Sequence, residues 1–248
     1  ESPRFAILVE PDLPVKLQRP TVPPYCGVGQ LVYKKPGGKR SKGTAFAIGG
    51  NFIMTAAHCV CKYDTSNLNT EFVFVPASHL ENGVAEAMFG AWQIKPGTLP
   101  KTMPGWHDAS IHLHGHIACD VAVIELESRH GKTLEETVGA FRLRFDKDWT
   151  VNDVADFALD ALGYPKATGD HPLESGEMYI QRGSFVTENN GVMLRHGRMG
   201  RGSSGGPWVH STSMSGGKWP KVYGLTSHSR HQGENSSPAF DKTVEAFV

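Results

Sequence analysis

The chain has 248 residues, and its 25 Lys and Arg balance its 25 Asp and Glu, so the formal net charge is zero. This balance argues against nucleic acid and anionic membrane as partners, because binding either requires an excess of basic side chains. Hydrophobic residues make up 39% of the chain, and no apolar run approaches the ~20 residues of a membrane-spanning helix. The 28 Gly and 16 Pro favour many turns and hence a β-rich globular fold.

Short apolar runs separated by turn clusters predict a series of strands along the chain. We expect strands at 27–33, 44–48, 52–55, 71–75, 121–126 and 151–162. The last of these could also be an amphipathic helix, but the turn Gly163-Tyr164-Pro165 that follows it favours a strand. A short helix is predicted at 243–248, and the polar stretch 129–133 divides the chain into two halves of similar size.

Two short motifs with catalytic residue types stand far apart in the sequence. Residues 55–59 read Thr-Ala-Ala-His-Cys, and residues 202–207 read Gly-Ser-Ser-Gly-Gly-Pro. Between them an acidic residue, Asp120, heads the apolar run 121–126. A histidine, an acid and a serine in a glycine-rich turn are the groups that nucleophilic acyl transfer requires.

These groups define a candidate catalytic triad of His58, Asp120 and Ser204. A serine hydroxyl is a poor nucleophile at its ordinary pKa, so we expect His58 to act as the base that removes the Ser204 proton. Asp120 would fix the tautomer of the imidazole and stabilise the imidazolium that forms. The backbone N–H groups of Gly202 and Ser204 are the candidate oxyanion hole, because glycine permits the tight turn that aims them.

The order of the three groups along the chain discriminates between fold families. The turn around Ser204 also fits the nucleophile elbow of α/β-hydrolases, in which the acid and then the histidine follow the serine. No Asp or Glu lies between Ser204 and His231, so that order fails. An order with the acid first is also poor, because Asp12 is the only Asp before His58 and lies in a Pro-flanked segment. The order that survives is His58, Asp120, Ser204.

Taken together, the motifs resemble those of the chymotrypsin-like, or trypsin-fold, serine peptidases. The resemblance rests on residues 55–59, 120–126, 202–207 and 224–227. It implies an all-β fold of two six-stranded antiparallel β-barrels with a short C-terminal helix, and an active site between the barrels. The barrel at 1–130 would carry His58 and Asp120. The barrel at 131–248 would carry Ser204, the oxyanion hole and the specificity pocket.

Departures from the digestive enzymes of this family point to one of its branches. In those enzymes a new N-terminal amine pairs with an Asp just before the nucleophile, whereas here the chain begins at Glu1 and the preceding residue is Ser203. Residues 43–48 also lack the cysteine that usually pairs with the one after the catalytic histidine. The chain is more similar to the glutamyl-endopeptidase, or V8-like, branch. That resemblance implies a secreted, extracellular enzyme that matures from a zymogen by removal of a propeptide.

The resemblance also implies a substrate pocket between two segments that contain basic residues but no Asp or Glu. The candidate pocket residues are Arg198, Met199, Arg201, Thr226, Ser227, His228 and Ser229. A preference for Lys or Arg before the scissile bond would lack an anionic partner there, whereas Arg198, Arg201 and His228 could hold the carboxylate of Glu or Asp. The same arginines also fit solvated loop positions. The alternatives are an apolar pocket lined by Met199 and Thr226, or a catalytically silent binding protein with the same fold.

The four cysteines permit two disulfides. Because the folded barrel would bring their segments together, a bridge from Cys59 or Cys61 to Cys119 is feasible, and the other cysteine would then pair with Cys26. Composition alone favours free buried thiols equally.

A histidine-rich stretch is the remaining candidate for a site. If it were a strand, His112, His114 and His116 would share one face and could bind Zn or Cu. No further ligand at a compelling spacing completes such a site, so we expect exposed loop histidines and neither a metal nor a cofactor. The predicted partners are protein or peptide substrates and protein inhibitors, and the predicted state is a monomer.

Overall fold

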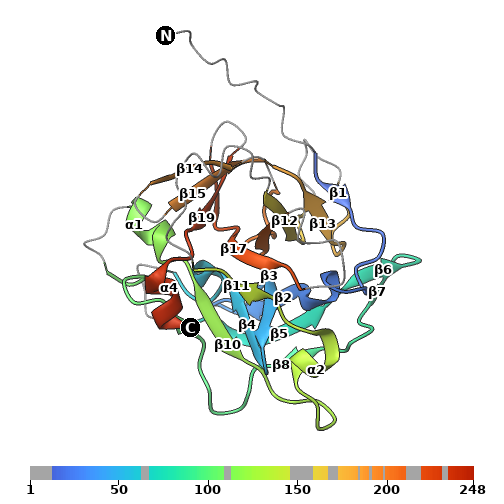
Figure 1. Ribbon diagram of the computed structural model, residues 1–248. Helices are drawn as coiled ribbons and strands as arrows, with labels where there is room; N and C mark the ends of the chain where they lie inside the picture. The colour runs from blue at the N-terminus through green and yellow to red at the C-terminus, as the bar shows by residue number, and fades with distance from the viewer. Residues whose placement is uncertain are drawn as a thin grey trace, which may run out of the picture.

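The computed structural model describes residues 13–62, 67–108, 113–145, 159–166, 173–183, 185–189, 192–197, 199–210, 219–230 and 234–248. Strands dominate these residues, and the helices among them are short (Figure 1). The prediction of an all-β fold with a C-terminal helix is therefore confirmed. None of the helices in the described ranges is long and apolar enough to span a membrane.

A seven-stranded antiparallel sheet is built from the first half of the chain. Its strands in spatial order are β8 (Trp92–Gln93), β5 (Thr70–Pro76), β2 (Val28–Lys34), β3 (Arg40–Gly49), β4 (Phe52–Thr55), β10 (Ala122–Glu125) and β9 (Lys101–Thr102). The bounds of β4 agree with the predicted strand 52–55, and β2, β3, β5 and β10 overlap the other four strands predicted in this half. This sheet occupies the lower part of the view in Figure 1.

Two further sheets lie mostly in the upper part of Figure 1, where β17 and β11 reach the middle of the view. The six-stranded sheet has the order β1 (Val15–Lys16), β13 (Tyr179–Gln181), β12 (Leu159–Gly163), β16 (Pro207–His210), β17 (Lys221–Leu225) and β11 (Arg142–Leu143). The four-stranded sheet has the order β14 (Phe185–Asn189), β15 (Val192–His196), β19 (Glu234–Pro238) and β18 (His228–Arg230). A separate hairpin pairs β6 (His79–Glu81) with β7 (Val84–Glu86).

The strand arrangement differs in detail from two six-stranded antiparallel barrels. One sheet has seven strands, and in the six-stranded sheet β11 pairs with β17 in parallel. In addition, β1 near the start of the chain pairs with β13, so an early segment joins a sheet that is otherwise built from residues after 141. The division into domains 1–130 and 131–248 stays a prediction.

Capping side chains account for two of the helices. In α2 (Leu134–Val138) the Thr133 hydroxyl accepts from the backbone N–H of Glu136, while the Glu136 carboxylate accepts from the backbone N–H of Thr133, a capping box. Asp241 accepts from two backbone N–H groups at the start of α4 (Lys242–Phe247). The helix predicted at 243–248 is therefore confirmed, and α2 is an element that the sequence analysis did not predict. The other helical segments are η1 (Tyr25–Gly27), η2 (Ala57–Cys59) and α1 (Leu113–Ala118).

The main hydrophobic core includes residues from both large sheets and from α4. Phe46 of β3, Leu162 of β12 and Val244 of α4 all belong to this one cluster and are almost fully buried. A smaller cluster surrounds Trp208 of β16. Because the main cluster is continuous, the two large sheets stabilise each other, and their relative position is fixed by packing.

Candidate active site

The β4–β10 pair brings His58 and Asp120 to the same edge of one sheet. β4 ends at Thr55, which lies opposite Ala122 at the start of β10. His58 follows β4 in η2, and Asp120 lies just before β10. Because the strands are antiparallel, the chain leaving one and the chain entering the other meet at a single edge. The register of this pair therefore makes the histidine motif and the acidic residue neighbours.

Asp120 holds His58 through two hydrogen bonds. The backbone N–H of His58 donates to Asp120 Oδ1 over 2.8 Å. His58 Nδ1 and Asp120 Oδ2 are also 2.8 Å apart, and an ionised carboxylate can only accept, so Nδ1 carries the proton. The Asp120 side chain is fully buried, whereas 27% of the His58 side chain is exposed. This arrangement fixes the orientation of the ring and leaves Nε2 as the nitrogen that can take up a proton.

Burial and charge act in opposite directions on the pKa values of this pair. Burial disfavours the imidazolium, but the charge and hydrogen bond of Asp120, together with neighbouring Cys59, outweigh this effect and raise the pKa of His58 well above its ordinary value of 6.5. Burial also disfavours the carboxylate, but the charge of His58 and the hydrogen bonds outweigh it and lower the pKa of Asp120. The pair therefore combines an ionised Asp120 with an unusually basic His58.

Ser204 lies in a tight turn that leads into β16. Gly202 and Gly205 in this turn have φ angles of +98° and +87°, a region that strains any residue with a Cβ atom. A Cβ on Gly205 would lie 2.2 Å from both the Thr44 carbonyl oxygen and Thr55 Oγ1. The turn is therefore packed directly against β3 and β4, with no room for a larger residue at Gly205.

Thr44 of β3 fixes the Ser204 turn to the seven-stranded sheet, a role that the sequence analysis did not identify. Its backbone N–H donates to the Ser204 carbonyl over 2.8 Å, and its hydroxyl donates to the Gly202 carbonyl over 2.9 Å. The same hydroxyl accepts from the backbone N–H of Tyr164 over 3.0 Å. Cys59 in η2 contacts the Ser204 carbonyl through Sγ. The signal in the sequence is a polar residue at the start of the predicted strand 44–48, whose other residues are apolar.

Ser227 provides a second connection, from the six-stranded sheet to the His58–Asp120 pair. It follows β17, and its Oγ donates to Asp120 Oδ2. Ser227 was predicted only as a pocket residue, and this hydrogen bond is an additional contact. Of the other predicted pocket residues, Arg198 lies outside the described residues, and only the backbone of Ser229, in β18, is described.

The remaining predicted pocket residues have different surroundings. Met199 is fully buried in the smaller core cluster with Trp208. Thr226 is also buried, and its Oγ1 accepts from Trp208 Nε1 over 2.9 Å. Arg201 is exposed, and His228 exposes 44% of its side chain. The side chains of Met199 and Thr226, which were proposed to line an apolar pocket, therefore pack in the protein interior. The basic residues Arg201 and His228 are accessible to solvent.

The predicted disulfides do not form in the structure. All four cysteines are free thiols. Cys26 Sγ donates to the Val138 carbonyl over 3.2 Å, and Cys61 Sγ lies 3.6 Å from His107 Nε2. Burial raises the pKa of Cys26 to about 11 and also raises that of Cys61, which keeps both thiols protonated.

The histidine-rich stretch is not a strand where it is described. Residues 113–118 form the short helix α1, in which positions two apart do not share a face. His116 is buried, with its ring edge-on to that of Trp106. His112 lies outside the described residues, and nothing is described of the His114 side chain. The prediction of exposed loop histidines was therefore wrong for His116, which is buried in a helix, and residues 113–118 do not form the strand that a three-histidine face would require.

Among the described residues, one cluster has the ligand types for a metal ion. It consists of His58, Asp120 and His228, whose ligand atoms lie within 4.8 Å of one another. An ion bound among them would have to replace the proton shared between His58 and Asp120 over 2.8 Å. We therefore interpret this cluster as a set of proton-carrying groups.

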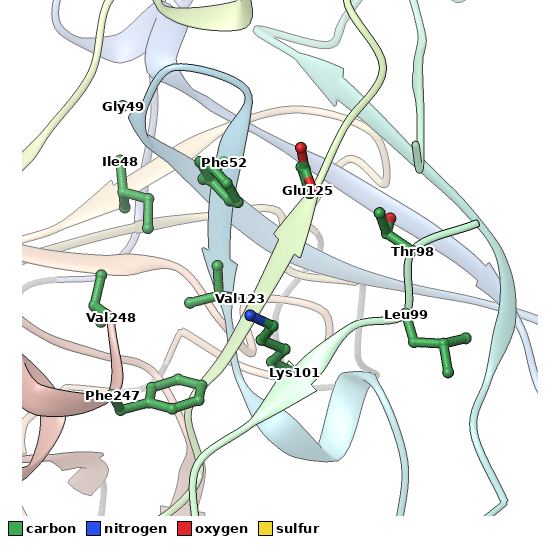
Figure 2. Close-up of a pocket in the computed structure, with 10 residues that line it drawn as sticks. All are labelled: Ile48, Gly49, Phe52, Thr98, Leu99, Lys101, Val123, Glu125, Phe247 and Val248. Carbon is green, nitrogen blue, oxygen red and sulfur yellow. The ribbon is translucent and has the colours of Figure 1, made fainter. Parts of the chain in front are cut away.

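A cavity of about 650 Å³ lies away from these residues. It is lined by Ile48, Gly49, Phe52, Thr98, Leu99, Lys101, Val123, Glu125, Phe247 and Val248 (Figure 2). Figure 2 shows side chains of β4 and β10 on one side and the end of α4 on the other. Its walls are mainly apolar, and its Glu125 carboxylate is paired with Lys95 over 2.6 Å. None of the predicted catalytic residues lines this cavity.

The family model described as trypsin matches residues 30–248, which is most of the chain. The chain belongs to the trypsin family. Membership of this family identifies it as a serine endopeptidase and confirms the resemblance drawn from residues 55–59, 120–126 and 202–207. No curated protein sequence matched the chain.

Several solved structures share the fold of this trypsin-family chain. The protease Anisep from Arthrobacter nicotinovorans has a TM-score of 0.69 at 19% identity, with 96% of this chain and 95% of that chain covered. The thermostable serine protease AL20 from an extremophilic microorganism has a TM-score of 0.70 at 20% identity, covering 89% and 94%. A Glu endopeptidase in complex with MPD has a TM-score of 0.70 at 18% identity, covering 95% of both chains. At these identities the matches show the fold alone.

Proposed function

We propose that this trypsin-family protein hydrolyses peptide bonds through a triad of His58, Asp120 and Ser204 and a covalent acyl-enzyme. The observation that carries the proposal is the pair of 2.8 Å hydrogen bonds from His58 to the buried Asp120. They orient the imidazole so that Nε2 can accept a proton, and the raised pKa of His58 makes its neutral form a stronger proton acceptor. The Ser204 turn is held against the same edge by Thr44.

In the proposed reaction, His58 Nε2 removes the Ser204 proton while Ser204 Oγ attacks the scissile carbonyl carbon. The backbone N–H groups of Gly202 and Ser204 would stabilise the resulting oxyanion. Neither N–H group donates a hydrogen bond to another backbone group in the part of the chain that the structure describes. The protonated His58 then donates to the leaving amine, which breaks the peptide bond and leaves an acyl-enzyme. Water attacks the ester with His58 again as base, releasing the second product and regenerating Ser204.

We further propose that the enzyme prefers Glu or Asp before the scissile bond. Arg201, immediately before Gly202, is exposed, and His228 is partly exposed beside the triad. Met199 and Thr226, the candidates for an apolar pocket, are instead buried in packing contacts. One structural neighbour is a Glu endopeptidase, which agrees with this preference. Secretion and zymogen processing stay predictions.

Cleavage-site profiling of a diverse peptide mixture by mass spectrometry tests both proposals, with Ser204→Ala as the matched control. We expect cleavage after Glu and Asp that disappears in the Ser204→Ala protein, and Arg201→Gln should lower kcat/KM for Glu substrates more than for Leu substrates. Cleavage after apolar residues would overturn the acidic preference and leave the triad intact. Absence of any Ser204-dependent cleavage would overturn the triad and favour the silent binding protein.

A further inference from the structure

His228 is a second imidazole beside the proposed triad, and the mechanism above gives it no role in proton transfer. It begins β18, directly after Ser227. Its Nδ1 lies 2.7 Å from Ser227 Oγ and 3.7 Å from Asp120 Oδ2. The centroid of its ring is 5.1 Å from that of His58, with the ring planes 53° apart. The two imidazoles therefore flank one carboxylate oxygen.

The direction of each hydrogen bond follows from the number of protons available. The Asp120 carboxylate has no proton, so the Ser227 hydroxyl donates to it. A hydroxyl has only one proton, so the contact between Ser227 Oγ and His228 requires His228 Nδ1–H as the donor. The result is a chain of two hydrogen bonds from His228 through Ser227 to Asp120. It ends on the same oxygen that accepts the His58 ring proton.

The charges around His228 favour its neutral, donating form near neutral pH. Among the residues that the structure describes, the charged and titratable groups that act on it are Asp120 and His58. Burial lowers the pKa of His228 most, the Asp120 carboxylate partly opposes this, and the charge of His58 lowers it further. His58, whose own pKa is raised, therefore takes up a proton at a higher pH than His228. The two rings titrate as a coupled pair around one carboxylate.

We propose that His228 is a positioning residue of the triad, which orients the Ser227 hydroxyl toward Asp120 and thereby sets how tightly His58 holds its proton. Hydrogen bonds in a chain polarise and strengthen one another. A carboxylate that receives a stronger hydrogen bond from Ser227 attracts the His58 proton less. Removing the His228 donor should therefore make His58 hold its proton more tightly. This inference rests on the function proposed above.

The test compares three substitutions at His228 in the full-length protein. His228→Phe keeps a flat ring but removes the donor, and His228→Gln places its amide near the position of Nε2, out of reach of Ser227. His228→Asn places an amide N–H near the position of Nδ1 and should restore the hydrogen bond. His79→Phe is the matched control, because it removes a half-buried imidazole from the hairpin strand β6.

Two readouts are measured, the pH dependence of kcat/KM and an NMR titration of the His58 imidazole in the Ser204→Ala background. We expect Phe and Gln at position 228 to move the acid limb and the His58 titration to higher pH by about half a unit, roughly a threefold change in proton affinity. Asn should return both toward the wild-type position, and His79→Phe should move neither. Thermal unfolding identifies any variant that does not fold. If the Phe variant does not fold, the comparison uses the Gln variant in its place.

The outcomes separate this inference from the proposed function. Ser204-dependent hydrolysis with unchanged titrations in the Phe and Gln variants would overturn the role of His228 and leave the triad intact. A shift that Asn does not reverse would also overturn it, because loss of the ring rather than of the donor would then be the cause. If the wild-type protein shows no Ser204-dependent hydrolysis, the proposed function fails, and the NMR titration still decides whether His228 acts on His58.

Discussion

At the scale of single residues, the account depends on the buried carboxylate of Asp120. It accepts hydrogen bonds from the backbone and ring of His58 and from the hydroxyl of Ser227. These contacts offset the cost of burying a charge. The carboxylate in turn raises the pKa of His58. The basicity of the proposed general base is therefore a property of the group rather than of the histidine alone.

Asp120→Asn should lower kcat by about 10⁴-fold, because an amide holds the imidazole in the wrong tautomer. It should also move the acid limb of the kcat/KM profile. In the wild-type protein the raised pKa of His58 means that activity is lost as pH falls through a value above 6.5. Without the carboxylate this limb should move to lower pH. Rates within tenfold of wild type, on an unshifted profile, would contradict the role of Asp120.

Thr44→Val should lower kcat by roughly tenfold or more, because it preserves shape but leaves the carbonyl of Gly202 and the amide of Tyr164 without their hydrogen bonds. A buried group without its partner costs about 1–3 kcal/mol. Thr44→Ser retains the hydroxyl and should remain near wild type. Steady-state kinetics gives the kcat of both variants, and thermal unfolding checks that both are folded. Equal losses in Val and Ser variants would show that the methyl group matters instead.

At the scale of elements, the Ser204 turn can form only because its glycines allow positive φ and close approach to β3 and β4. Gly205→Ala should destabilise the protein by about 2–5 kcal/mol, combining backbone strain with overlap with Thr44 and Thr55. Gly37→Ala is the control, since Gly37 also has positive φ but nothing lies within 4 Å of its added Cβ, so only about 1–2 kcal/mol of strain applies. Denaturant unfolding gives both values. A Gly205→Ala protein no less stable than Gly37→Ala would argue against the tight packing.

The strand β3 and the element η2 are close enough for a disulfide that the natural sequence lacks. A Cβ added at Gly43 would lie 2.9 Å from Cys59 Sγ, close to the separation across a disulfide. Gly43→Cys should therefore form a bridge to Cys59 under oxidising conditions and raise the midpoint of unfolding. Peptide mapping without reduction detects the bridge. A Gly43→Cys protein that keeps both thiols free after oxidation would contradict this geometry.

The same elements show how far the sequence could predict the structure. Strands with alternating or continuous apolar residues, such as 52–55, were predicted because burial on the sheet imposes that pattern. The triad residues could be proposed because acyl transfer requires their chemical types in a restricted order. The helix α1 and the contacts of Thr44 could not be predicted, because they depend on partners distant in the sequence. The free cysteines likewise depend on distances that spacing alone does not give.

At the scale of the whole molecule, the proposed site lies between the two large sheets. Neither half of the chain supplies all three triad residues. His58 and Asp120 come from the seven-stranded sheet, while the Ser204 turn leads into the six-stranded one. Thr44 and Ser227 make hydrogen bonds across the boundary, and one hydrophobic core extends through both sheets. The relative position of the sheets therefore determines whether the proposed nucleophile and base can react.

The most direct test of the central claim is covalent labelling with a serine-directed peptidyl phosphonate, followed by peptide mapping. The account predicts one adduct, on Ser204, formed in the folded wild-type protein. It predicts no adduct in Ser204→Ala and a strongly reduced labelling rate in Asp120→Asn, because the nucleophile requires an oriented base. An adduct on a different serine, or peptide hydrolysis that persists in Ser204→Ala, would contradict the proposed triad.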